Sequence, residues 1–279
     1  MKFWRIILVL GMLFSWLRPV NAVDAAAQGR RLPPPPKEIS TAALIDGVDW
    51  HIYIKDLHTN EMLLQLNADQ VMHPASLIKV PIAVLVLAEL QGDKMPIADM
   101  PVRGIKKQTY DQLISSMIVR SVEPSADILE SYIKGAAFNI TLLQDWGLKN
   151  TVLTPRRSTA ADLGLLLEKL YRGELLNPEY TDYLLAKMSE YTPTDDEYLG
   201  VIKNRFPDSI LYNKRGTLLA PVIVADMGIL HTDTADYVIV ISGNKQNTGP
   251  TFEEIKASLE TFARHLALYL HGRTLDALP

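Results

Sequence analysis

The sequence predicts an α+β fold of the α/β sandwich type, with one mixed antiparallel sheet built from both chain ends. Helices flank this sheet, and an all-helical subdomain separates its two halves in the sequence. Apolar and polar residues alternate near both chain ends, whereas apolar residues recur every three or four positions in the middle. With 279 residues, 48% of them hydrophobic, the chain can bury a sizeable core as one large domain. A cleft between sheet and subdomain is the expected ligand site.

The N-terminus is predicted to be a secretory signal peptide over residues 1–22. Lys2 and Arg5 precede an apolar segment at residues 6–17, and small residues at 20–22 provide a cleavage site. This segment is shorter than the roughly 20 residues of a membrane span, although an uncleaved anchor remains the alternative. We therefore expect a bacterial protein exported to the periplasm or the medium, which contacts a membrane only through this segment.

A linker and one folded domain are predicted to follow the signal peptide. Four prolines at residues 33–36 indicate a stiff spacer within the linker 23–40, which leaves residues 41–279 for the domain. The chain has no cysteine, so disulfides and a lipoprotein anchor are excluded. Its net charge of −4 argues against nucleic acid as a partner. We expect a monomer.

Periodicity locates the first strands and the helical block. Trp50, Ile52 and Ile54 alternate with polar residues, and the alternation resumes at 62–66 after a turn at 58–61, which predicts a β-hairpin. Amphipathic stretches then predict helices at residues 77–90, 110–119, 124–134, 140–146, 159–171 and 178–189.

Strands return in the last third of the chain, at residues 210–213, 222–230 and 237–242. The final helix begins after Thr251, which forms a predicted capping box with Glu254, and it continues with apolar residues at spacings of three and four. These strands complete the sheet, and the final helix packs against it.

Ser76 and Lys79 are the first candidate catalytic residues. They lie at the start of an apolar helix, where Pro74 and Ser76 are helix-start signals. Residues three apart share one face of a helix, so the Lys79 amine can reach the Ser76 hydroxyl as the base for a nucleophile.

The same S-x-x-K pattern occurs twice more, in contexts that do not favour catalysis. Ser131 and Lys134 close a helix before Gly135, and residues 242–245 are expected in a loop after a strand. Only the pattern at residues 76–79 begins a buried helix.

Two further polar segments are expected to face the same cleft. Ser121 and Glu123 lie in a short loop between two predicted helices. Residues 214–217 (KRGT) end the predicted strand at 210–213, where Gly216 allows the backbone to approach a ligand closely.

These three motifs resemble those of the penicillin-recognising serine acyltransferases, and most of all those of class A β-lactamases. The similarity spans residues 45–271, with an S-x-x-K motif at 76–79, an S-x-N-like motif at 121–123 and a K-T-G-like motif at 214–216. It implies a β-lactam or a peptidoglycan stem peptide as substrate, and neither a metal nor an organic cofactor.

The resemblance also implies a role for each residue. Ser76 would attack a β-lactam or D-Ala-D-Ala-type carbonyl and form an acyl-enzyme, with Lys79 helping to take its proton. Ser121 would relay a proton to the leaving nitrogen, and Lys214 would hold that hydroxyl and the substrate carboxylate. Backbone N–H groups of Ser76 and Thr217 would form an oxyanion hole, worth about 3–4 kcal/mol per donor.

The chain departs from the family pattern in a loop that is important for turnover. Class A β-lactamases carry there a glutamate that activates the water for deacylation, whereas residues 147–158 of this chain contain no acid. We therefore expect slow deacylation, and a D,D-peptidase or penicillin-binding role is the alternative.

Two motif positions also differ. Glu123 replaces an asparagine whose amide donates to the substrate, and an ionised carboxylate has no proton to donate. Near Lys79, Glu123 would either accept a proton itself or form an ion pair that silences the site. Arg215 replaces a threonine or serine, and its side chain would either bind a substrate carboxylate or point away from the cleft.

Purely structural roles are the competing interpretation of these residues. Ser76 and Ser121 are possible helix caps, Lys79 a lysine reaching from a helix end to solvent, and residues 214–215 a solvated strand end. The chain would then be a non-catalytic relative on the same fold. The six histidines show no metal-ligand spacing. A serine hydrolase with an acyl-enzyme mechanism and a pseudoenzyme both remain open.

Overall fold

The computed structural model describes residues 36–276, apart from residues 93, 103, 105–106, 134–135 and 191–196. The predicted signal peptide at residues 1–22 and the predicted linker up to residue 35 lie outside the described residues. None of the helices in the described ranges combines the length and the hydropathy that a membrane crossing requires.

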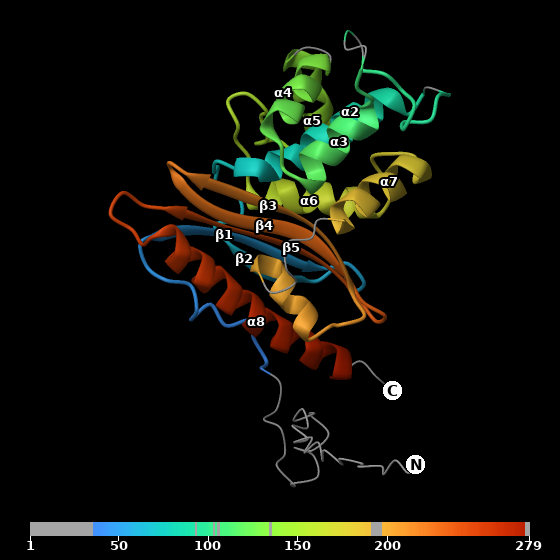
Figure 1. Cartoon of the computed structure of the whole chain (residues 1–279). Helices are drawn as coiled ribbons and strands as arrows, with labels where there is room; N and C mark the ends of the chain where they lie inside the picture. Colours follow the sequence, from blue (N-terminus) through green and yellow to red (C-terminus); the bar gives the residue numbers. More distant parts are fainter. Residues whose placement is uncertain are drawn as a thin grey trace, which may run out of the picture. The chain divides into compact units, whose positions relative to one another are not determined.

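One five-stranded sheet forms the centre of the domain, in the order β2-β1-β5-β4-β3 (Figure 1). Every neighbouring pair is antiparallel. The first and last strands of the chain meet at the middle of the sheet, because β1 pairs with β5 along its whole length. The predicted α+β fold with a sheet from both chain ends is thereby confirmed. The strands are β1 Val48–Asp56, β2 Met62–Leu66, β3 Ile210–Leu219, β4 Val222–His231 and β5 Asp236–Lys245.

Helices cover both faces of the sheet, and most of them lie where periodicity predicts them. Thr251 and Glu254 form the predicted capping box at the start of the last helix. The helices are η1 Ala75–Ile78, α2 Lys79–Leu90, α3 Tyr110–Val119, α4 Glu123–Tyr132, α5 Ala136–Asp145, α6 Ala160–Tyr171, α7 Pro178–Ser189, η2 Tyr198–Asn204 and α8 Phe252–Asp276.

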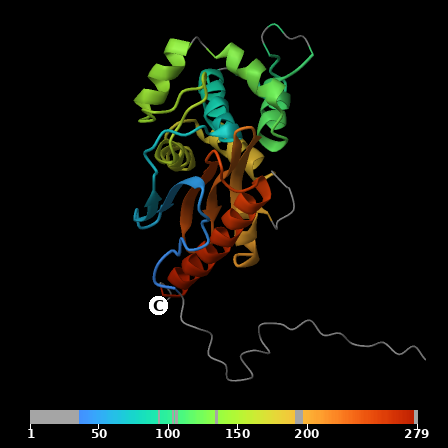
Figure 2. The same cartoon turned by 90° about the vertical axis from the view of Figure 1, so that its left-hand side faces the viewer.

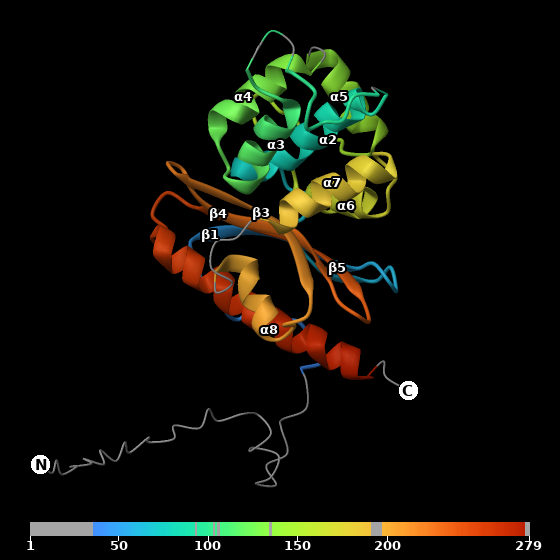
Figure 3. The same ribbon diagram turned by 45° about the vertical axis from the view of Figure 1, so that its right-hand side comes forward.

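Alternate side chains of the sheet enter two different hydrophobic cores. Val224 and Ile241 pack with α8 and η2 on one face, whereas Ala225 and Val240 pack with the helical block on the other. Figure 2 shows the helical block and α8 on opposite sides of the sheet, and Figure 3 shows η2 beside α8. Adjacent residues of one strand therefore serve different cores, as the pleat of a strand requires.

The helix α2 is buried on all sides within the helical block. All nine residues from Lys79 to Leu87 are buried. A helix that is apolar around its whole circumference belongs in the interior of a protein. Lys79, the first residue of this helix, is therefore drawn into the interior by its neighbours.

Three predicted segment ends are wrong, and in the two strands the reason is that polar residues continue the sheet. Strand β3 continues to Leu219, so residues 214–217 lie inside it and not at its end, and β5 includes residues 242–245, which were expected in a loop. Backbone hydrogen bonds to neighbouring strands hold these polar residues in the sheet. The helix expected to close at Lys134 ends at Tyr132, and residues 134 and 135 lie outside the described residues.

A close contact between α6 and β1 makes Gly164 sensitive to substitution. A Cβ atom at Gly164 would collide with the ring of Tyr53, whereas one at Gly92 would meet nothing. We expect Gly164→Ala to lower the free energy of unfolding by about 1–3 kcal/mol through overpacking. Gly92→Ala, as the control, should change it by less than about 0.5 kcal/mol. Urea unfolding measures both values, and an unchanged stability of Gly164→Ala would show that the ring of Tyr53 yields without cost.

Candidate active site

Ser76 lies in η1, the short 3-10 turn that leads into α2. It is half-buried, between Ala75 and Leu77, which are both buried. Ala75 has a φ of 47°, a conformation that non-glycine residues seldom adopt, and its N–H donates to Nδ1 of His73 at 3.1 Å. The cap positions of η1 and α2 are Pro74 and Ile78, so Ser76 does not act as a helix cap.

The Lys79 amine is the centre of the polar cluster. Its side chain is 1% exposed, so it does not reach out to solvent. Nζ lies 3.1 Å from Oγ of Ser76, 2.7 Å from the carbonyl oxygen of Ser121 and 3.3 Å from Oγ of Ser121. A carboxylate oxygen of Glu123 lies 2.9 Å from the same amine. Burial of this charge is tolerated because oxygen atoms surround it.

Ser121 owes its contact with Lys79 to an unusual backbone conformation. Its φ is 57°, in the left-handed region, and the following N–H of Val122 donates to the carbonyl oxygen of Ser116. This turn directs both the carbonyl and the hydroxyl of Ser121 to one amine. Val122 and not Ser121 occupies the cap position of α4, so the capping role considered for Ser121 is wrong. Backbone strain of this kind tends to occur at functional sites.

Glu123 bridges two cations. One carboxylate oxygen pairs with Lys79, and the other pairs with Nη2 of Arg156. Partial burial opposes ionisation of Glu123, but hydrogen bonds from Arg156 and Lys79 outweigh it, and the pKa of Glu123 is lowered from its ordinary value. The carboxylate is 46% exposed, so water weakens these attractions. Glu123 is therefore a weak base that is ionised at neutral pH and forms ion pairs with both cations.

Arg156 is the site residue that sequence reasoning missed. It belongs to the loop at residues 147–158, in which only the absence of an acid was noted. The basic pair Arg156 and Arg157 was the available signal, but periodicity does not predict the direction of a loop side chain. Burial, and then the charge of Arg156, lowers the pKa of His73, which places this guanidinium near the Ser76 turn as well.

Lys214 brings a second buried amine to the helical face of β3. The residue is fully buried, and Nζ donates to the carbonyl oxygen of Arg215 at 3.3 Å. Burial, followed by repulsion from Lys79, lowers the pKa of Lys214 to about 7, although Asp226 and Glu123 act in the opposite direction. At neutral pH this amine therefore exchanges readily between its two protonation states.

Gly216 and Thr217 continue β3 along the Ser76 turn. A Cβ atom at Gly216 would lie 3.0 Å from Cγ of Leu77 and 3.1 Å from the carbonyl oxygen of Pro74. Glycine thus permits the close approach of β3 to η1. Thr217 is exposed, and β3 is an edge strand, whose alternate N–H groups point away from the sheet.

Arg215 lies on the opposite face of β3, so its side chain takes the second of the two predicted orientations and points away from the cluster, which argues against the substrate-binding role. Its guanidinium binds Glu197 at 2.9 Å and stacks 4.5 Å from the ring centre of Tyr198, on the face covered by α8. Lys214 and Arg215 are both buried, so a solvated strand end is also wrong. Neighbouring residues of a strand point to opposite faces, and only Lys214 joins the cluster.

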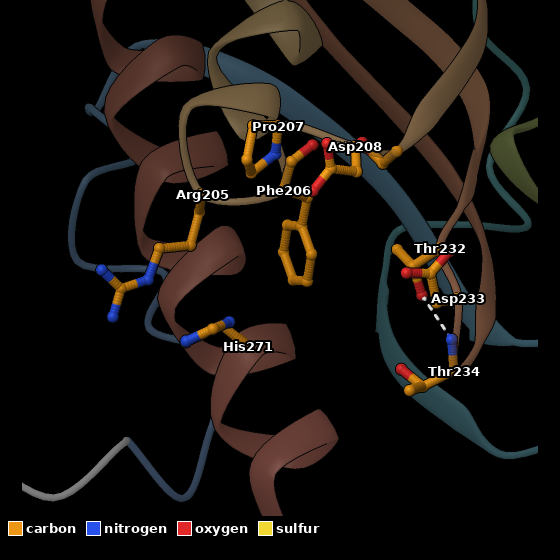
Figure 4. Close-up of a pocket in the computed structure, with 9 residues that line it drawn as sticks. Arg205, Phe206, Pro207, Asp208, Thr232, Asp233, Thr234 and His271 are labelled. Atoms are coloured by element: carbon orange, nitrogen blue, oxygen red, sulfur yellow. Dashed lines mark hydrogen bonds between the residues drawn. The ribbon is translucent and has the colours of Figure 1, made fainter.

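In the part of the chain that the structure describes, no three His, Asp or Glu side chains gather as metal ligands. A separate pocket has a volume of about 210 Å³ and is lined by residues that include Phe206, Asp233 and His271 (Figure 4). Its volume is below the about 300 Å³ at which ligand pockets begin, and none of its lining residues belongs to the cluster.

The lowered pKa of Lys214 predicts a change of stability with pH. Between about pH 7 and the ordinary lysine value of 10.5, the unfolded chain binds a proton that the folded chain has lost. We expect the wild type to gain stability relative to Lys214→Met from pH 7 to pH 9, by at most about 1.4 kcal/mol per pH unit. Urea unfolding at both pH values measures this gain. A constant difference would mean that folded Lys214 keeps its proton.

This chain is similar in sequence to one family model and in fold to several solved structures. A family model described as "Beta-lactamase enzyme family" matches residues 36–267. The structure of PBP-A is 20% identical, over 89% of this chain and 100% of its own, with a TM-score of 0.69. A β-lactamase from Chitinophaga pinensis DSM 2588 is 18% identical, over 81% of this chain and 95% of its own, with a TM-score of 0.65. The TLA-1 extended-spectrum β-lactamase is 17% identical over the same shares, with a TM-score of 0.70.

A search of curated proteins finds no match. At such low identities, the solved structures demonstrate a common fold and nothing finer. The family model extends over most of the chain and includes the Ser76 turn, the Ser121 loop and β3. The chain therefore belongs to the β-lactamase enzyme family.

Proposed function

We propose that this protein is an exported serine hydrolase that forms a Ser76 acyl-enzyme with β-lactams or D-Ala-D-Ala-type amides and releases it slowly. The observation that carries the proposal is the contact of one buried amine, Nζ of Lys79, with the Ser76 hydroxyl and with Ser121. A hydroxyl, a buried amine and a second hydroxyl within hydrogen-bond reach are suited to moving a proton from nucleophile to leaving group.

The proposed acylation uses only groups of this cluster. Ser76 Oγ attacks the carbonyl carbon while its proton passes toward the Lys79 amine. As the carbon–nitrogen bond breaks, the leaving nitrogen takes a proton from the Ser121 hydroxyl, which Lys79 then replaces. Backbone N–H groups of Ser76 and Thr217 stabilise the oxyanion. In its ammonium form, Lys214 attracts the carboxylate of the substrate.

Slow release of the acyl group follows from the character of the loop at residues 147–158. Near the cluster this loop presents the guanidinium of Arg156, which has only N–H donors and therefore cannot accept a proton from water. The same observation favours a penicillin-binding or D,D-peptidase role over rapid β-lactam hydrolysis. One variant of PBP-A, which resembles this chain in fold, is known as an acyl-enzyme complex with penicillin G.

A non-catalytic relative is the second candidate, and the ion pair of Lys79 with Glu123 favours it. In this 2.9 Å ion pair Lys79 is an ammonium group, which has three donors and no acceptor and so accepts no proton from Ser76. In the acylation scheme, Lys79 must lose this proton before it acts as a base.

Intact-protein mass spectrometry with penicillin G distinguishes these candidates. We expect the exported domain to gain the mass of one penicillin and to keep it over time, because no loop acid activates the deacylating water. Ser76→Ala should gain nothing. An adduct that disappears while hydrolysed penicillin accumulates would indicate an efficient β-lactamase. No adduct with penicillin, a D,D-peptide or a simple ester would favour the pseudoenzyme.

Glu123→Gln tests the effect of the ion pair on acylation. The amide of the variant accepts a hydrogen bond from Lys79 but does not attract its positive charge. A partly exposed ion pair contributes about 1 kcal/mol, which corresponds to a factor of about five. We therefore expect penicillin G to acylate Glu123→Gln about five times faster than the wild type. The rate of adduct formation measures the effect. A slower rate would instead assign the role of proton acceptor to Glu123.

A further inference from the structure

We infer that Arg156 is a specificity-determining residue, which donates a hydrogen bond to the carbonyl group on the acyl side of the substrate. This inference rests on the proposed function. Penicillins carry such a carbonyl in their acylamino side chain, and D-Ala-D-Ala peptides carry one in the preceding peptide bond. A carbonyl that enters a partly buried site without a donor loses the hydrogen bonds it made to water.

Glu123 cannot be this donor. Its carboxylate is ionised and therefore only accepts hydrogen bonds. One of its oxygens already faces Lys79, and the other faces Arg156. An acceptor at the rim of the site would repel a substrate carbonyl unless a donor lay beside it.

Arg156 is the donor that lies beside it. A guanidinium has five N–H groups, and the ion pair with Glu123 uses Nη2, which leaves the groups on Nε and Nη1 outside that contact. Its side chain is 20% exposed, so part of it is accessible from solvent. A side-chain amide at position 123 could both accept a hydrogen bond from Lys79 and donate one to the substrate. Here Glu123 accepts from Lys79, and Arg156 donates to the substrate carbonyl.

The loop around Arg156 is fixed with respect to both the nucleophile and α4. Backbone N–H and carbonyl groups of Ser158 and Met72 bond reciprocally at 2.8 and 3.1 Å, only four residues before Ser76. On the other side, the Thr154 hydroxyl donates to Glu130 of α4 at 2.6 Å. A donor held from both sides needs little ordering when substrate binds.

Two substrates and a matched control test the inference. Benzylpenicillin has the acyl carbonyl, whereas 6-aminopenicillanic acid has a free amine in its place. We expect Arg156→Met to lower the ratio of their acylation rate constants about tenfold, as for one charge-assisted hydrogen bond. Arg157→Met, at the neighbouring exposed position, should leave the ratio unchanged. The ratio cancels effects on Ser76 and Lys79, which act on both compounds.

A second change provides a rescue. In the Arg156→Met background, Glu123→Gln supplies an amide that both accepts from Lys79 and donates, so the ratio should return toward that of the wild type. If Arg156→Met does not fold by circular dichroism, Arg156→Ala, which also lacks a side-chain donor, replaces it in the comparison.

The outcomes separate this inference from the proposed function. An unchanged ratio in Arg156→Met, with both compounds still attached to Ser76, would overturn the role of Arg156 and leave the acyl-enzyme intact. Failure of both compounds to acylate the wild type would overturn both. A ratio that falls equally in Arg157→Met would indicate a general effect of loop charge and would also overturn the inference.

Discussion

The burial of one lysine amine is the constraint on which this site depends. Lys79 begins a helix whose apolar circumference fixes it inside the helical block, so its charged end cannot move to water. The amine must instead find oxygen atoms within the protein, because an unpaired buried charge is prohibitively unfavourable. The left-handed turn at Ser121 and the carboxylate of Glu123 meet this requirement. The arrangement of the cluster is thus first a consequence of helix packing, and it is then available for chemistry.

The guanidinium of Arg156 changes the electrostatic and hydrogen-bonding properties of Glu123. A lone carboxylate beside Lys79 would add a negative charge to the rim of the site. Paired with a guanidinium, the same carboxylate becomes part of a neutral group with both accepting and donating sides. In our proposal, the donor lost with the family's asparagine at position 123 is supplied by Arg156, from the loop at residues 147–158.

Periodicity was enough to predict the layers of the fold but not the ends of its strands. The hairpin of β1 and β2 and the helices α3 and α7 follow from regular apolar spacing. The end of β3 was misplaced because the polar residues 214–217 were interpreted as a segment that follows the strand, whereas Lys214 and Arg215 lie inside it, buried on opposite faces. The motifs around Ser76 and Ser121 pointed to residues that do lie together. Arg156 was missed because the direction of its side chain depends on tertiary contacts.

The pairing of β1 with β5 also sets an order for the folding of the chain. Val48 lies opposite Lys245, so the middle of the sheet joins segments that are nearly two hundred residues apart. Contacts between such distant segments form late and slow the folding of a domain. Until β5 is present, the hairpin of β1 and β2 retains an open edge that can associate with other chains. A nascent chain therefore cannot complete the sheet, or place β3 beside Ser76, before its last third has been made.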